Sequence, residues 1–129
     1  GAIRLACLEE TLSLLPQGLG SEVGERGERL SGGQRQAVAI ARALVGKPRM
    51  LLLDEPSSMM DPGTEQRLIE NLRSIQGQTI LLVTHRMAML PLVDRLVVLD
   101  QGRVVLDGPR NDVLRALQNR QPNQTEGAA

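Results

Sequence analysis

The first half of the chain shows two stretches with helical spacing. Apolar residues recur every three or four positions at Leu5, Leu8, Leu12 and Leu15. This spacing predicts an amphipathic helix over residues 3–15, which Pro16 ends. A polar loop with two glycines follows over residues 21–29, and residues 34–44 then predict a second helix with one apolar face.

Two short apolar runs, 50–53 and 79–83, show no alternation of polar and apolar residues. Such runs are typical of strands that are buried on both faces of a parallel sheet. Between them, Asp61 and Pro62 have the residue types that cap and begin a helix, and apolar residues recur from Leu68 to Ile75. The order strand, helix, strand predicts a right-handed parallel crossover.

The last part of the chain predicts a hairpin and a helix. Apolar residues 96–99 and 104–106 flank a turn that contains Gly102, and residues 113–117 have helical spacing. Residues 121–129 are polar and small, so we expect this tail to be disordered.

Composition narrows the class of protein. The chain has 129 residues, of which 41% are hydrophobic and 23% are charged, as expected for one globular unit or a piece of one. The 15 basic residues equal the 15 acidic ones, so nucleic acid is not an expected partner. No apolar run reaches the roughly 18 residues that a membrane helix needs. The first residue is Gly1 rather than Met, and we expect further sequence upstream.

Some residue types occur once or not at all, and this excludes several kinds of binding site. Cys7 and His85 are the only residues of their types, which excludes an internal disulfide and a zinc site built from several Cys and His ligands. Phe, Tyr and Trp are absent, so no aromatic ring of this chain can stack on a nucleotide base. Any nucleotide site here would be incomplete on the base side.

The start of the second helix has the residue types of an anion site. Ser31, Gly32, Gly33 and Gln34 stand at this point. Glycines let the backbone approach a ligand, and a helix N-terminus directs free N–H groups and positive dipole charge outward. A bare Ser-Gly-Gly is more often a simple helix cap, so the interpretation depends on the rest of the chain.

Polar residues follow the ends of both apolar strands. Asp54 and Glu55 end the first strand, and His85 follows the second. Ligands bind at the carboxyl ends of parallel strands, where an aspartate can hold Mg²⁺ and a glutamate can accept a proton from water. A parallel crossover would bring His85 to the same edge, where imidazole can donate to a phosphate oxygen.

These motifs together resemble the ATP-binding cassette family. Residues 30–34 resemble its signature motif, residues 51–56 its Walker B segment, residues 57–61 its D-loop, and His85 its switch histidine. Order and spacing agree from about Ile3 to Leu117. The resemblance implies an α/β fold, namely part of the P-loop NTPase fold with parallel strands, part of the helical signature subdomain, and a C-terminal hairpin with a helix.

The resemblance also implies roles for these residues. ATP and Mg²⁺ are the expected cofactors, with ATP held between two copies of the domain in a homodimer. Ser31 and the backbone of Gly32 and Gly33 would bind the γ-phosphate of the partner's ATP, and Gln34 would belong to the same nucleotide-binding site. In its own site, Asp54 would position Mg²⁺, Glu55 would be the general base and His85 would contact the γ-phosphate. Asp61 would lie at the dimer interface.

The expected boundaries follow from the same resemblance. Residues 1–120 would be the C-terminal part of a nucleotide-binding domain, with the helical signature subdomain over 1–46 and part of the catalytic subdomain over 47–120. The loop from Glu22 to Gly27 resembles the one with which exporter-type cassettes contact their transmembrane domain. Residues 34–39 and 85–108 resemble the ATPases of bacterial type I protein secretion, which implies a place at the cytoplasmic face of the inner membrane.

Other interpretations remain open at this point. The function can be that of a lipid, drug or peptide exporter, of a soluble cassette ATPase of DNA repair, or of a degenerate cassette that serves only in dimerisation. Long heptad arms and basic surfaces typical of DNA-repair ATPases are not seen, and intact Ser31, Asp54, Glu55 and His85 disfavour the degenerate form. The transported substrate cannot be deduced.

The chain also departs from the family pattern. No Gly-x-x-x-x-Gly-Lys-Ser/Thr motif, no adenine-stacking aromatic residue and no glutamine loop occur in it, while Met59 and Met60 are mild variations of the D-loop. We therefore expect the isolated chain to be inactive. Because its strands would lack their usual neighbours, we also expect it to be marginally stable or prone to aggregation.

Overall fold

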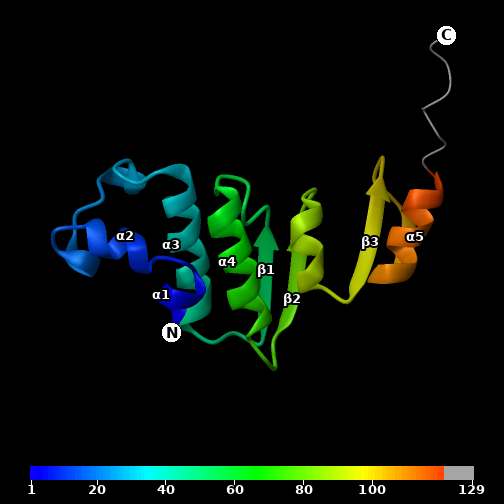
Figure 1. Ribbon diagram of the computed structural model, residues 1–129, viewed down its shortest axis with the longest axis horizontal. Helices are drawn as coiled ribbons and strands as arrows, with labels where there is room; N and C mark the ends of the chain where they lie inside the picture. Colours follow the sequence, from blue (N-terminus) through cyan, green and yellow to red (C-terminus); the bar gives the residue numbers. More distant parts are fainter. Residues whose placement is uncertain (121–129) are drawn as a thin grey trace, which may run out of the picture. The chain divides into compact units, whose positions relative to one another are not determined.

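A computed structural model describes residues 1–120 of the chain (Figure 1). The chain divides into two compact units, one over residues 1–92 and one from Val93 onward. Within residues 1–120, no helix combines the length and apolar character needed to cross a membrane. The elements are those of an α/β protein with parallel strands, as the sequence predicts.

The N-terminal helix is divided rather than continuous. Helix α1 spans Ala2–Leu5 and helix α2 spans Glu9–Leu14, whereas the apolar spacing predicts one helix over 3–15. Cys7 interrupts the helix because its φ of 59° lies in the left-handed region. Ala6 and Leu8, on either side of the break, are both buried. The apolar residues therefore still face the core although the helix is not continuous.

Two 3-10 turns, η1 (Gly18–Gly20) and η2 (Glu25–Gly27), lie in the polar segment that precedes the signature residues. Helix α3 (Gly32–Val45) then follows, with buried Ala37, Ile40, Ala41 and Leu44 on one face. This face agrees with the predicted apolar stripe. Helix α1 contacts both α3 and α4 (Figure 1).

Strands β1 (Met50–Asp54) and β2 (Thr79–Val83) pair in parallel. Helix α4 (Pro62–Arg73) connects them, and the 3-10 segment η3 (Met87–Leu92) follows β2. Parallel pairing between strands joined by a helix confirms the predicted crossover connection. The register sets Asp54 opposite Val83, so both strands end at the same edge of the sheet.

The burial of the two strands differs from the prediction. In β1, Leu51 and Leu53 are buried while Met50 and Leu52 are exposed, and in β2 residues of intermediate burial alternate with exposed ones. Leu51 and Leu53 pack with residues of the helices in one core, whereas Met50 and Leu52, which point to the other face of the sheet, are exposed. The lack of alternation in the sequence therefore does not correspond to burial on both faces in this structure.

One apolar core joins the helices to the covered face of the sheet. It is built from α3, α4, β1 and the turn between α1 and α2, with Leu68 and Leu72 fully buried. Burial of a leucine side chain contributes about 1.5 to 3 kcal/mol. This core fixes the starting points of α3 and α4, from which the candidate site is built.

The second unit is a hairpin with a helix. Strands β3 (Arg95–Asp100) and β4 (Arg103–Pro109) are antiparallel, and helix α5 (Arg110–Arg120) contacts both. Gln101 and Gly102 have φ values of 45° and 75°, as tight hairpin turns require. The predicted hairpin and last helix are thus present, with longer bounds than the apolar runs indicate. The tail expected to be disordered, 121–129, lies outside the described residues.

Candidate active site

The shared edge of β1 and β2 brings Glu55 and His85 together. Nδ1 of His85 lies 2.7 Å from Oε1 of Glu55, and the backbone N–H of His85 donates to the same oxygen at 3.0 Å. The hydrogen bond from the His85 side chain is the largest cause that lowers the pKa of Glu55. Glu55 is therefore ionised at neutral pH, the form that a general base requires.

Thr84 also holds the Glu55 carboxylate. Its Oγ1 donates to the second oxygen of Glu55, Oε2, at 3.2 Å. Both carboxylate oxygens are thus oriented by the two residues that follow β2. Thr84 was not among the predicted site residues, although its hydroxyl, next to His85 in the sequence, was a usable signal.

The backbone of Glu55 is in an unusual conformation. Its φ is 44°, which is uncommon for a residue with a side chain and costs about 1 to 2 kcal/mol. Two backbone hydrogen bonds hold it: Glu55 N donates to Val83 O at 2.9 Å, and Ser58 N donates to Glu55 O at 3.2 Å. The turn at Glu55 directs its side chain to Thr84 and His85.

Asp54, the last residue of β1, is exposed. Within the described part of the chain its carboxylate has no hydrogen-bond or ion-pair partner, and no group of three or more His, Cys, Asp or Glu residues could hold a metal ion. Mg²⁺ usually binds one or two carboxylates together with substrate phosphates and water. A single free carboxylate beside Glu55 fits that pattern, because the other ligands would come from the nucleotide.

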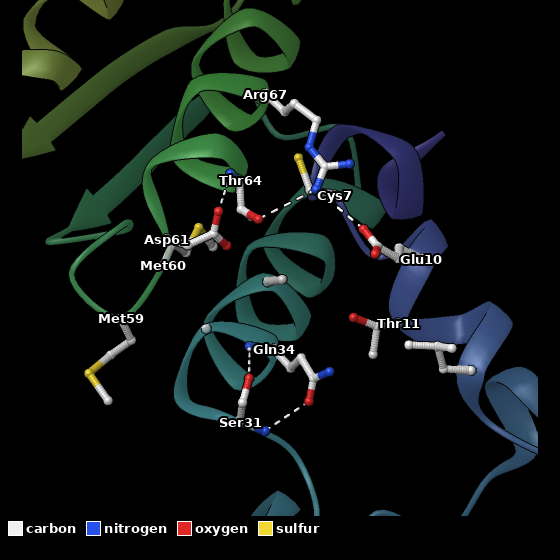
Figure 2. Close-up of a pocket in the computed structure, with 13 residues that line it drawn as sticks. Cys7, Glu10, Thr11, Ser31, Gln34, Met59, Met60, Asp61, Thr64 and Arg67 are labelled. Carbon is white, nitrogen blue, oxygen red and sulfur yellow. Dashed lines mark hydrogen bonds and ion pairs between the residues drawn. The ribbon is translucent and has the colours of Figure 1, made fainter.

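The predicted anion site has a capping box at the start of α3 (Figure 2). Ser31 Oγ accepts from Gln34 N at 3.2 Å, and Gln34 Oε1 accepts from Ser31 N at 2.8 Å. The Gln34 side chain is therefore engaged in capping. The N–H groups of Gly32 and Gly33 have no acceptor among residues 1–120, and the Ser31 hydroxyl only accepts, so its proton is available to a ligand.

Asp61 caps α4, as the sequence predicts. Its side chain accepts from Thr64 N at 3.0 Å, and hydrogen bonds from Thr64 lower its pKa. Asp61 and three signature residues, Ser31, Gly33 and Gln34, line one cavity of about 230 Å³ (Figure 2). Asp54, Glu55 and His85 do not line it. The candidate residues thus form two groups, one at the sheet edge and one around this cavity.

A buried polar cluster supports the sheet edge and was not predicted. Ser57 Oγ donates to Glu65 Oε1 at 2.5 Å, and Arg86 contacts the same carboxylate through Nε at 2.8 Å and Nη2 at 2.9 Å. Ser57 is 1% exposed and Glu65 is 5% exposed. One signal in the sequence was available, because Glu65 lies on the apolar stripe of α4 with Leu68 and Leu72.

Replacing His85 with alanine tests the contact with Glu55. We expect the pKa of Glu55 to rise towards its usual value of 4.5, because the largest cause of its lowering is removed. A carboxyl whose pKa is lowered by folding contributes stability at neutral pH that is lost as the pH falls through that pKa. An NMR titration of the intact domain measures the shift. An unchanged pKa in His85→Ala would show that Thr84 or the backbone dominates instead.

The sequence of this chain is similar to those of known proteins. Residues 6–58 match the family model described as ABC transporter. The chain is 43% identical over 112 residues to an export ATP-binding/permease protein of Rickettsia felis, which covers 86% of this chain and 19% of the relative. It is 40% identical over 115 residues to the leukotoxin translocation ATP-binding protein of Mannheimia haemolytica, covering 88% of this chain and 16% of the relative.

A solved structure extends the likeness to the fold. The structure of a bacterial Atm1-family ABC exporter with ATP bound matches with a TM-score of 0.82 and 41% sequence identity, covering 89% of this chain and 20% of that chain. The chain thus spans about one sixth to one fifth of the length of these three relatives. From these likenesses and its motifs, the chain is identified as part of an ABC transporter nucleotide-binding domain.

Proposed function

We propose that the chain is part of a subunit that binds and hydrolyses ATP to drive export across a membrane. The contact of 2.7 Å between Glu55 and His85 at the ends of two parallel strands carries this proposal. An ionised carboxylate can accept the proton of an attacking water, and a protonated imidazole can donate from Nδ1 to that carboxylate and from Nε2 to a phosphate oxygen. The names of the relatives, which refer to export and translocation, support the same activity.

In this proposal the two groups of residues serve different nucleotides. Glu55 is the general base, His85 contacts the γ-phosphate and Asp54 positions Mg²⁺ in the subunit's own site. Ser31 and the backbone of Gly32 and Gly33 contact the γ-phosphate of ATP bound to the partner in a homodimer. Gln34 belongs to the same nucleotide-binding site, and Asp61 lies at the interface. The free N–H groups at the start of α3 support the second role, because they are unsatisfied within the described chain.

The remaining assignments concern the whole transporter. We propose that residues 1–46 belong to the helical signature subdomain and residues 47–120 to the catalytic subdomain. The loop from Glu22 to Gly27 contacts a transmembrane domain, and the domain lies at the cytoplasmic face of a bacterial inner membrane. Exposed charged side chains and the turn η2 in that loop suit a peripheral contact.

For the transported substrate we propose a protein, as in type I secretion. The similarity to leukotoxin translocation proteins supports it. An exporter of another substrate class is the second candidate, because the Rickettsia relative and the Atm1-family exporter are equally similar. The upstream sequence of the full-length protein tests the choice. A phosphate-binding loop preceded by about six membrane helices supports an exporter, and a peptidase-like domain before them supports protein secretion.

ATP binding by the isolated chain tests whether the nucleotide site depends on residues outside this chain. A helix N-terminus contributes about 0.3 to 2 kcal/mol towards an anion and each charge-assisted hydrogen bond about 1.5 to 3 kcal/mol, before ordering costs. Millimolar affinity already requires about 4 kcal/mol. We therefore expect this chain alone to bind ATP no more tightly than about millimolar, without turnover, when measured by calorimetry. Micromolar affinity would contradict the proposed division of the site.

A further inference from the structure

Gln36 connects the signature helix to the loop that carries Glu55. Its Nε2 donates to the backbone carbonyl of Glu55 at 2.8 Å and to Ser58 Oγ at 2.8 Å, and its Oε1 accepts from Met59 N at 3.1 Å. The three partners lie 19 to 23 positions away in sequence. One side chain on the second turn of α3 thus holds several residues of the loop between β1 and α4.

The orientation of this carboxamide is unambiguous. A backbone carbonyl can only accept and a backbone N–H can only donate, so the nitrogen must face Glu55 O and the oxygen must face Met59 N. Ser58 Oγ adds a second acceptor for the nitrogen. No hydrophobic or shorter polar residue at position 36 could satisfy these groups together.

The bond to Glu55 reaches a residue in a strained conformation. The φ of Glu55 is 44°, and its carbonyl accepts from both Gln36 Nε2 and Ser58 N. Strained backbone persists only where its surroundings determine it. Gln36 is therefore one of the contacts that define the direction in which the Glu55 side chain leaves the backbone.

Close packing between α3 and this loop supports the same connection. A Cβ atom added at Gly33 would lie 2.8 Å from the backbone oxygen of Met59, closer than real Cβ contacts allow. The start of α3 therefore lies directly against the loop, and a displacement of one requires a displacement of the other. Gln36 supplies the hydrogen bonds of this contact, and Gly33 supplies the space.

We propose that Gln36 is a positioning residue that couples the two ATP sites of the dimer through one subunit. This inference rests on the proposed function, in which the start of α3 contacts the partner's ATP while Glu55 acts on the subunit's own. ATP that fixes the start of α3 also fixes the Glu55 carbonyl through Gln36. The carboxylate is then held in its productive position when both sites are filled.

The test uses the full-length protein with Gln36→Ala and Gln36→Glu. Gln36→Glu keeps an acceptor for Met59 N but loses the donor to Glu55 O and introduces a carboxylate beside that carbonyl. We expect both variants to lower kcat for ATP by about 10- to 100-fold with KM changed less than about twofold, because the base is misplaced while binding contacts remain. Gln66→Ala is the matched control, since Gln66 is exposed on α4 and its side chain bonds, among the described residues, only Glu70.

A second measurement separates positioning from a loss of structure. In the Glu55→Gln background, Gln36→Ala should keep ATP-dependent dimerisation within about twofold, because the start of α3 still contacts the partner's ATP. Turnover equal to the Gln66→Ala control, or a parallel loss of dimerisation and turnover in both Gln36 variants, would overturn the role of Gln36. Wild-type protein that does not hydrolyse ATP would instead contradict the proposed function itself.

Discussion

Replacing Glu55 with glutamine in the full-length protein should remove ATP turnover while ATP binding is retained. The amide keeps the shape of the carboxylate but cannot accept a proton from water, and general-base catalysis contributes about 10²- to 10⁴-fold. We expect kcat to fall by about that factor. The rate of phosphate release and the binding of a fluorescent ATP analogue, measured on the same preparation, check both parts.

The matched control for this prediction is Glu70→Gln. Glu70 is exposed on α4, and within the described part of the chain its carboxylate accepts only from Gln66, so the same chemical change there should leave turnover within about twofold. Thr84→Val is a useful companion, because it removes the donor to Glu55 Oε2 and leaves the carboxylate in place. If Glu55→Gln turns over ATP at the wild-type rate, Glu55 is not the base and the contact with His85 has another purpose.

The ends of the strands were predictable because the rules for them are local. Strands β1 and β2 end at Asp54 and Val83, and parallel pairing brings the residues that follow them to one edge of the sheet. The helix caps at Ser31 and Asp61 were predictable for a similar reason, since capping residues bond to N–H groups three positions later. Contacts of this kind depend on a few residues that are adjacent in sequence, so they can be predicted from the sequence alone.

Other features depend on residues that are distant in sequence. The bonds of Gln36 to Ser58 and of Arg86 to Glu65 span 22 and 21 positions, and nothing local specifies either partner. The sequence also did not predict the break in the helix at Cys7, because the residues usually found in left-handed backbone conformation are Gly and Asn. The burial of the strands depends on how many layers of helices cover the sheet. The periodicity of apolar residues does not predict that number.

Removing Arg86 from the buried cluster should cause the largest loss of stability. Arg86→Met leaves the carboxylate of Glu65, which is 5% exposed, with the Ser57 hydroxyl as its one remaining partner among residues 1–120. Breaking a buried ion pair costs about 3 to 5 kcal/mol, and because the Arg86 side chain is 30% exposed we expect about 3 kcal/mol. Urea unfolding of the intact nucleotide-binding domain measures this loss in the free energy of unfolding.

Two further variants decide whether the loss comes from the uncompensated charge. Arg67→Met removes an arginine from an exposed pair with Glu10 at 3.5 Å and should cost less than about 1 kcal/mol. Glu65→Leu combined with Arg86→Met removes both charges, and most of the stability should return, since apolar replacement of a whole buried pair is often neutral. A double variant as unstable as Arg86→Met would mean that the cluster stabilises the fold through its hydrogen bonds to Ser57. In that case the free energy of unfolding should fall by a similar amount in Ser57→Ala, which leaves the ion pair intact.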